Sequence, residues 1–125
     1  MPLALLRSRL TSLSELAGVR GVAIVDSASG MVIEQAGTVE NLETLAEAAI
    51  EFWRLSGRLR TSLSSLDALN AAALSFARGM LLLQPLTTVS SERALILVAI
   101  VTTEQVDWQQ WNQAVTSLSQ TAQTV

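Results

Sequence analysis

The chain contains no cysteine, histidine, lysine or tyrosine among its 125 residues. Without cysteine it can form neither a disulfide nor a thiolate site, and without histidine as well it lacks the usual ligand sets for zinc and iron. The reactive groups that remain are carboxylates, hydroxyls and arginines, none of which is an obvious general base near neutral pH. We therefore expect a protein that is not an enzyme and that uses no metal and no cofactor.

Charged residues and long apolar runs are also scarce. Only 15% of the residues are charged, the net charge is −3 and the arginines are scattered, which disfavours nucleic-acid binding. The longest uninterrupted apolar run, Ala94 to Val101, is far shorter than the roughly 20 residues that a membrane-spanning helix needs. Arginines follow the short apolar start of the chain, which disfavours a secretory signal. These features predict a cytoplasmic protein with no nucleic-acid or membrane partner.

The length fits one domain over residues 1–125, able to bury roughly two thirds of its unfolded surface. Half of the residues are hydrophobic, which is high for a soluble domain of this size. Some apolar surface is therefore expected to remain for a partner.

Hydrophobic periodicity predicts the order helix, two strands, helix, three strands, helix. Gly18 is well placed to end the first helix in the left-handed conformation, and Arg78-Gly79 has the glycine that a tight hairpin requires. The aliphatic run at 93–101 is typical of a strand in the middle of a sheet. The predicted helices span 3–17, 41–60 and a segment after 104, and the predicted strands span 19–25, 31–36, 70–77, 80–86 and 93–101, with a polar loop at 87–92.

The helix at 41–60 has too much apolar surface for one neighbour. Its polar side chains occupy an arc of about 100°, whereas its apolar side chains spread over roughly 220°. Two apolar sets result, one for a sheet and one for a second helix, and the pattern does not decide between them. Small residues favour close helix packing by the second set. The first set is Leu45, Ala48, Phe52, Leu55 and Leu59, and the second is Leu42, Ala46, Ala49, Ile50 and Trp53.

This order of elements, with the segments LAGVRGVAIVDSASG at 16–30 and FARGMLLLQPL at 76–86, resembles the Roadblock (dynein light chain) family, in particular its bacterial-type regulators of small GTPases. The resemblance covers nearly the whole chain. It implies an α+β fold with one layer of five antiparallel strands in the order 2-1-5-4-3, the central helix on one face and the two terminal helices on the other. It further implies a homodimer that binds or regulates a Ras-like GTPase, and it carries over no catalytic residue.

An unguarded sheet edge indicates where two copies would meet. In the family's strand order the strand at 70–77 is terminal, yet it contains no charge, proline or glycine to deter pairing. We predict that this strand pairs with its copy while the second apolar set of the central helix packs beside it. The predicted dimer interface is Leu42, Ala46, Ala49, Ile50, Trp53, Ala71, Ala73 and Ser75, and the candidate partner contacts at loop tips are Arg78 and Arg93.

Several other polar and aromatic residues have both a structural and a functional interpretation. Asp26 fits a turn better than a metal or phosphate site, and Trp108 and Trp111 fit a helix face packed on the sheet. The row Glu43, Glu47 and Glu51 could recruit a basic partner, although it is also the only solvated face that this helix has.

The function expected is therefore a non-enzymatic homodimeric regulator or binding partner of a Ras-like GTPase. The alternative is a scaffold or adaptor subunit of a motor or signalling complex with no effect on GTP hydrolysis. A small-molecule sensor or enzyme would need a cleft with convergent arginine and glutamate side chains.

Overall fold

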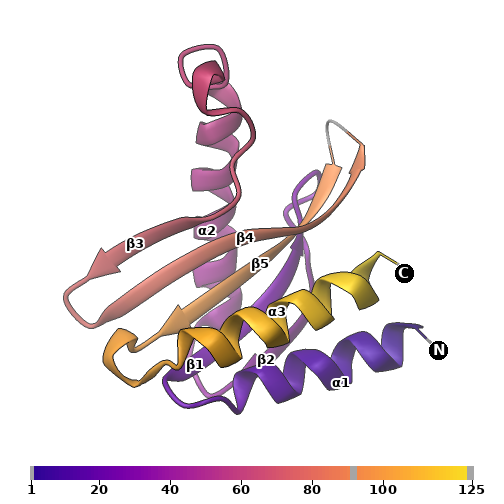
Figure 1. Cartoon of the computed structure of the whole chain (residues 1–125), viewed down its shortest axis with the longest axis vertical. Coiled ribbons are helices and arrows are strands. Elements are labelled where there is room, and N and C mark those ends of the chain that lie inside the picture. The colour runs from indigo at the N-terminus through magenta and orange to yellow at the C-terminus, as the bar shows by residue number, and fades with distance from the viewer. Residues whose placement is uncertain (1, 91–92, 124–125) are drawn as a thin grey trace.

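The computed structural model describes residues 2–90 and 93–123, with the backbone alone at residues 2, 87–90 and 93. These residues form the predicted order of helices and strands (Figure 1). The helices are α1 (Pro2–Ser14), α2 (Leu42–Arg58) and α3 (Trp108–Ala122), with short 3-10 helices η1 (Ser64–Leu66) and η2 (Thr103–Gln105). The strands are β1 (Val19–Asp26), β2 (Val32–Gly37), β3 (Ala72–Phe76), β4 (Gly79–Ser90) and β5 (Arg93–Val101).

The strands form one antiparallel sheet in the order β2-β1-β5-β4-β3, which is the predicted order. The aliphatic strand β5 lies in the middle, as its sequence predicts, and Ile96 and Val98 are fully buried. Both sides of β5 are paired and both faces are covered, so an uninterrupted apolar sequence suits it. The predicted α+β fold is confirmed.

Helices α1 and α3 lie side by side on one face of the sheet (Figure 1). Their apolar stripes meet the sheet through Leu6, Leu10 and Leu13 of α1 and through Trp111, Val115 and Leu118 of α3. Outside this core, Arg7 Nη2 donates to Glu34 Oε1 at 2.8 Å and ties α1 to β2. Hydrogen bonding to Glu34 raises the pKa of the Arg7 guanidinium, which favours its cationic form.

Helix α2 covers the opposite face of the sheet, and it does so with the set of residues that we predicted for a second helix. Leu42, Ala46, Ala49 and Ile50 are buried in one cluster with Val25, Ile96 and Val98 of the sheet, and Trp53 packs against that cluster. The predicted assignment of Leu42, Ala46, Ala49 and Ile50 to the dimer interface is therefore corrected, because their surface is used within the protomer, whereas for the half-buried Trp53 it stays a prediction. Two of the four residues are alanines, and their small size lets the helix approach the sheet closely.

Several element boundaries differ from the predictions. Strand β4 continues through residues 87–90, which we expected to be a loop, and residues 91–92 lie outside the described part of the chain. Pro85 is tolerated within β4 because β3 pairs only as far as Leu83 and a bulge follows the proline. Helix α2 continues past Gly57 but ends at Arg58, two residues before the predicted end.

The turn from β2 into α2 depends on a close backbone approach. Gly37 has a φ of +115°, and a Cβ atom built on it would lie 2.6 Å from the Cα atom of Gly21 on the paired strand β1. Only glycine fits both the conformation and the space. Asn41 is the N-cap residue of α2 and has the left-handed conformation, but its side chain makes no capping hydrogen bond.

Candidate protein-interaction site

The outer flank of α2 is an exposed apolar surface. Leu45, Phe52, Leu55 and Leu59 retain 36%, 40%, 42% and 42% of their surface exposed. These residues belong to the apolar set that we had assigned to the sheet, so the two sets are exchanged relative to the prediction. At about 100° per residue they form a stripe roughly 120° away from the residues that meet the sheet. We call this stripe the α2 flank.

The free edge of the sheet at β3 lies on the same side of the molecule. The glutamates of α2 lie beside the β1–β2 hairpin, so the α2 flank faces away from β2 and toward β3 and β4. Ala71, Ala73 and Ser75 are exposed, and Phe76 is 60% exposed. A strand edge without charges next to an apolar helix flank is the usual composition of a surface that another chain covers.

The end of α2 extends this apolar surface. The helix projects beyond the sheet at the top of Figure 1, and the segment after it is exposed. Leu63 and Leu66 in that segment are 43% and 76% exposed. Arg54 and Arg58 of α2 and Arg60 just beyond it are also exposed.

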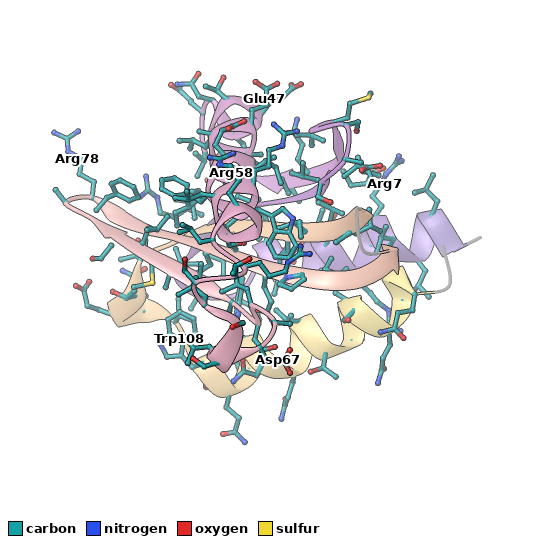
Figure 2. The ribbon with its side chains drawn as sticks, turned by 90° about the horizontal axis from the view of Figure 1, so that it is seen from above. Arg7, Glu47, Arg58, Asp67, Arg78 and Trp108 are labelled. Carbon is teal, nitrogen blue, oxygen red and sulfur yellow. The ribbon has the colours of Figure 1, made fainter. Side chains whose placement is uncertain are left out.

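Arg78 is at the tip of the β3–β4 hairpin, and Figure 2 shows its side chain pointing away from the body of the protein. The backbone of the tip is held in place, because Arg20 Nη1 donates to the carbonyl oxygen of Arg78 at 2.8 Å. The side chain of Arg93, the other predicted contact, lies outside the described part of the structure.

The remaining candidates have the structural roles that we favoured. Asp26 Oδ1 accepts hydrogen bonds from the backbone N–H groups of Ala28 and Ser29 at 2.9 and 3.4 Å and so closes the β1–β2 turn. Trp111 is buried and meets Trp108 edge to face, with ring centroids 6.3 Å apart. Trp108 itself is 40% exposed, so the packing prediction holds in full for Trp111 alone.

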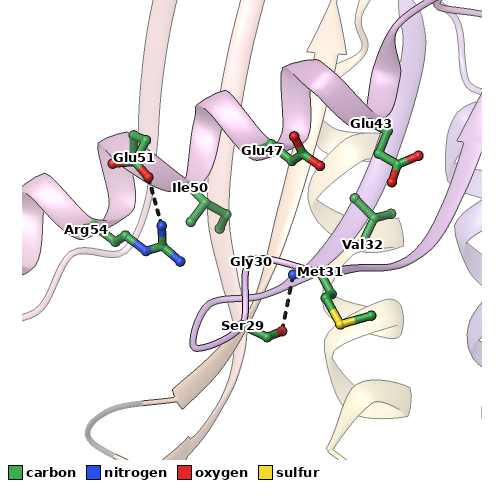
Figure 3. A pocket seen from close by; sticks show the side chains of 9 residues that line it. All are labelled: Ser29, Gly30, Met31, Val32, Glu43, Glu47, Ile50, Glu51 and Arg54. Carbon is green, nitrogen blue, oxygen red and sulfur yellow. Dashed lines mark hydrogen bonds and ion pairs between the residues drawn. The ribbon is translucent and has the colours of Figure 1, made fainter.

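A shallow groove runs between α2 and β2. It consists of two hollows of about 380 and 370 Å³, and Glu43 lines both. Glu43, Glu47 and Glu51 form one wall, and residues 29–32 form the other (Figure 3). Arg54 also reaches the groove, but it pairs with Glu51 at 2.8 Å and both side chains remain substantially exposed. This open arrangement does not form the desolvated cleft that a catalytic pair requires.

The described residues offer little other chemistry. Within residues 2–90 and 93–123 there is no group of three or more histidine, cysteine, aspartate or glutamate side chains that could hold a metal ion. In the same part of the chain, none of the helices has the length and apolar character that spanning a membrane requires.

The fold is that of the Roadblock/LC7 domain. Over 94% of each chain, a Roadblock/LC7 domain from Streptomyces avermitilis superposes with a TM-score of 0.75 at 12% sequence identity. The described order of strands and the placement of helices on the two faces agree with this α+β fold.

Two solved MglB structures resemble the chain equally well. Myxococcus xanthus MglB has a TM-score of 0.74 at 19% identity, with 96% of this chain and 86% of that chain covered. The gliding protein MglB of Thermus thermophilus has a TM-score of 0.75 at 15% identity, with 99% and 93% covered. Compared by sequence alone, the chain matches no protein-family model and no curated protein. The likeness is therefore one of fold, and it confirms the resemblance inferred from the sequence at that level.

Proposed function

We propose that this chain is a homodimeric regulator of a Ras-like small GTPase and has no active site of its own. The observation that carries the proposal is the exposed α2 flank beside the open edge of β3, on a chain with the Roadblock/LC7 fold. The resemblance to the Roadblock family implies both the dimer and the GTPase partner. The absence of histidine, cysteine and lysine favours regulation by binding over chemistry.

In the dimer that we propose, β3 pairs with its copy across a two-fold axis and the sheet continues from one protomer to the next. Ala71, Ala73 and Ser75 remain our predicted interface residues on the strand, and the α2 flank replaces the helix residues predicted from the sequence. An isologous contact doubles every interaction that one protomer makes. With two helix flanks and two strands covered, the interface would exceed about 2,000 Å², as obligate dimers do.

The GTPase would be regulated without an arginine finger. A finger must reach the γ-phosphate, and its loss costs roughly 10³ to 10⁵ in rate. Arg78 is exposed, but the Arg20 bond to its carbonyl oxygen fixes the hairpin tip from which it projects. The dimer would instead favour one arrangement of the GTPase's own switch segments, an effect limited by its differential affinity for the two arrangements.

The test is single-turnover GTP hydrolysis by a Ras-like GTPase encoded in the same genome, with and without this protein. Light scattering first establishes whether the protein is a dimer at low micromolar concentration. We expect faster hydrolysis with wild type, and a change of less than about tenfold with Arg78→Ala or Arg58→Ala dimers that bind normally.

Each other outcome has a distinct meaning. A loss of a thousandfold or more in one arginine variant would make that residue a finger and refute the mechanism. Binding in either nucleotide state without any change in hydrolysis or nucleotide exchange would favour the scaffold alternative. A monomer, or a dimer that binds in neither nucleotide state, would refute the proposed function.

A further inference from the structure

We propose that the groove between α2 and β2 is a second docking site, which takes an extended basic segment of a partner protein with arginine or lysine at alternate positions. The groove is on the far side of α2 from the α2 flank, because it is lined by the β1–β2 hairpin and by the glutamates of the helix. It would therefore stay open in a dimer formed through β3. The proposal does not depend on the GTPase.

The charge of the groove selects a cationic partner. Its wall carries the three carboxylates of Glu43, Glu47 and Glu51 against the one guanidinium of Arg54 (Figure 3). Within residues 2–90 and 93–123, Glu43 and Glu47 form no ion pair and no side-chain hydrogen bond. Like charges four residues apart on a helix repel each other, so a bound cation relieves a cost that the free protein bears. Figure 2 shows Glu47 pointing away from the protein, where a partner can reach it.

The protein itself shows that the groove accepts a guanidinium. Arg54 Nη1 lies 2.8 Å from Glu51 Oε1, and a Cβ atom on Gly30 would lie 3.3 Å from Arg54 Nη2. The guanidinium thus bridges the space from the glutamate wall to the hairpin wall. An arginine from a partner can take the equivalent place beside Glu47 or Glu43.

The spacing of the carboxylates fits an extended chain. Residues four apart on a helix are about 6.0 Å apart along its axis, and alternate residues of a strand are about 6.6 Å apart. Cationic side chains at every second position therefore match Glu43 and Glu47 in register. Val32, which is half-buried, lines the groove and can cover the aliphatic stem of such a side chain.

The outer edge of β2 supplies the second half of the site. β2 is at the end of the sheet and pairs on one side with β1, so its outward backbone groups are available for another strand. Met31 and Ile33 beside this edge are 67% and 38% exposed. A second copy of this chain is a poor occupant, because its arginines two positions apart, at 7 and 9 and at 58 and 60, lie in helix α1 and at the end of helix α2 and not in an extended segment.

The test uses the full-length protein and a blocked eight-residue peptide in which arginine alternates with threonine. The affinity is compared for wild type, for a Glu43→Gln/Glu47→Gln variant and for a control variant, Glu15→Gln/Glu104→Gln, which has the same net charge. All four glutamates are exposed, so each variant should fold, which circular dichroism verifies. At roughly two- to fivefold per exposed ion pair, we expect the groove variant to bind about 4- to 25-fold more weakly and the control within twofold of wild type.

A fluorescent label locates the peptide. Because the chain has no cysteine, Gln35→Cys places a single label in the groove and Gln113→Cys places one on α3, on the other face of the sheet. A response to the peptide at position 35 and none at 113 supports the site. Equal weakening in both charge variants, equal responses at both labels, or no binding to wild type would each overturn the proposal.

Discussion

Replacing Phe52 by alanine should separate the proposed dimer into folded monomers. Phe52 retains 40% of its surface exposed on the α2 flank. A buried aromatic side chain covers roughly 150–250 Å², so complete burial at an interface would remove about 60–100 Å² more from water in each protomer. At about 25 cal/mol per Å² this contributes about 1.5–2.5 kcal/mol per protomer, or about 3–5 kcal/mol for a symmetric pair. The dimer dissociation constant of Phe52→Ala should therefore rise by about two to three and a half orders of magnitude.

A substitution on the buried side of α2, at Ala49, provides the contrast. Ala49 is fully buried against the sheet, so Ala49→Glu would force a carboxylate into the core of the protomer, at a cost of several kcal/mol. We expect that variant to lose its helical circular dichroism, whereas Phe52→Ala keeps a folded spectrum. Glu51→Ala, one residue away on the charged side, should leave both the spectrum and the dimer unchanged.

Sedimentation equilibrium at several loading concentrations measures the dissociation constants directly. The reasoning is refuted if wild type is a monomer at low micromolar concentration, or if Phe52→Ala dimerises as tightly as wild type. A folded Ala49→Glu monomer would also refute the reasoning. It would place Ala49 at the dimer interface, as we predicted from the sequence, and not against the sheet, as the structure has it.

Two further predictions concern the edge of the sheet and the close turn before α2. Ser75→Lys places a charge on the exposed edge of β3 and should shift the protein toward monomers in gel filtration while its circular dichroism spectrum remains that of a folded protein, and an unchanged elution volume would argue against strand pairing. Gly37→Ala should lower the melting temperature by several degrees, because its Cβ would lie 2.6 Å from the Cα of Gly21 and its φ is +115°. Gly57→Ala is the matched control: nothing lies within 4 Å of its Cβ and it is inside a helix, so it should raise stability by about 0.5–1 kcal/mol. Equal effects of the two substitutions in thermal denaturation would contradict this account.

The sequence alone determined most of the helices and strands, because the pattern of apolar residues in each segment reflects how that segment is buried. The run Ala94 to Val101 has no polar residue, and the structure covers it on both faces in the middle of the sheet. The order 2-1-5-4-3 came from the family resemblance and not from periodicity, since pairing partners leave little trace in the pattern of a single strand. The β4 extension was missed because its residues 87–90 are polar, which is also typical of a loop.

The candidate site was predicted in part. The edge position of the strand at 70–77 came from the family's strand order, and the absence of charge, proline and glycine marked this edge as open to pairing; Ala73 and Ser75 are exposed. The acidic row Glu43, Glu47 and Glu51 was recognised as solvated, but the hairpin that makes it one wall of a groove approaches only in the folded chain. The Asp26 turn was predicted correctly because its hydrogen bonds are local.

What the sequence determined about α2 is that it has two apolar faces and one charged face. Only the tertiary structure decided which apolar face is inside. At about 100° per residue the charged arc is separated by roughly 110–125° from both apolar sets, so amphipathicity does not distinguish them. The choice depends on shape: the face with Ala46 and Ala49 lets the helix axis come close to the sheet, while Phe52 and Leu59 remain on the surface. That fit between two surfaces exists only once the strands have assembled beneath the helix.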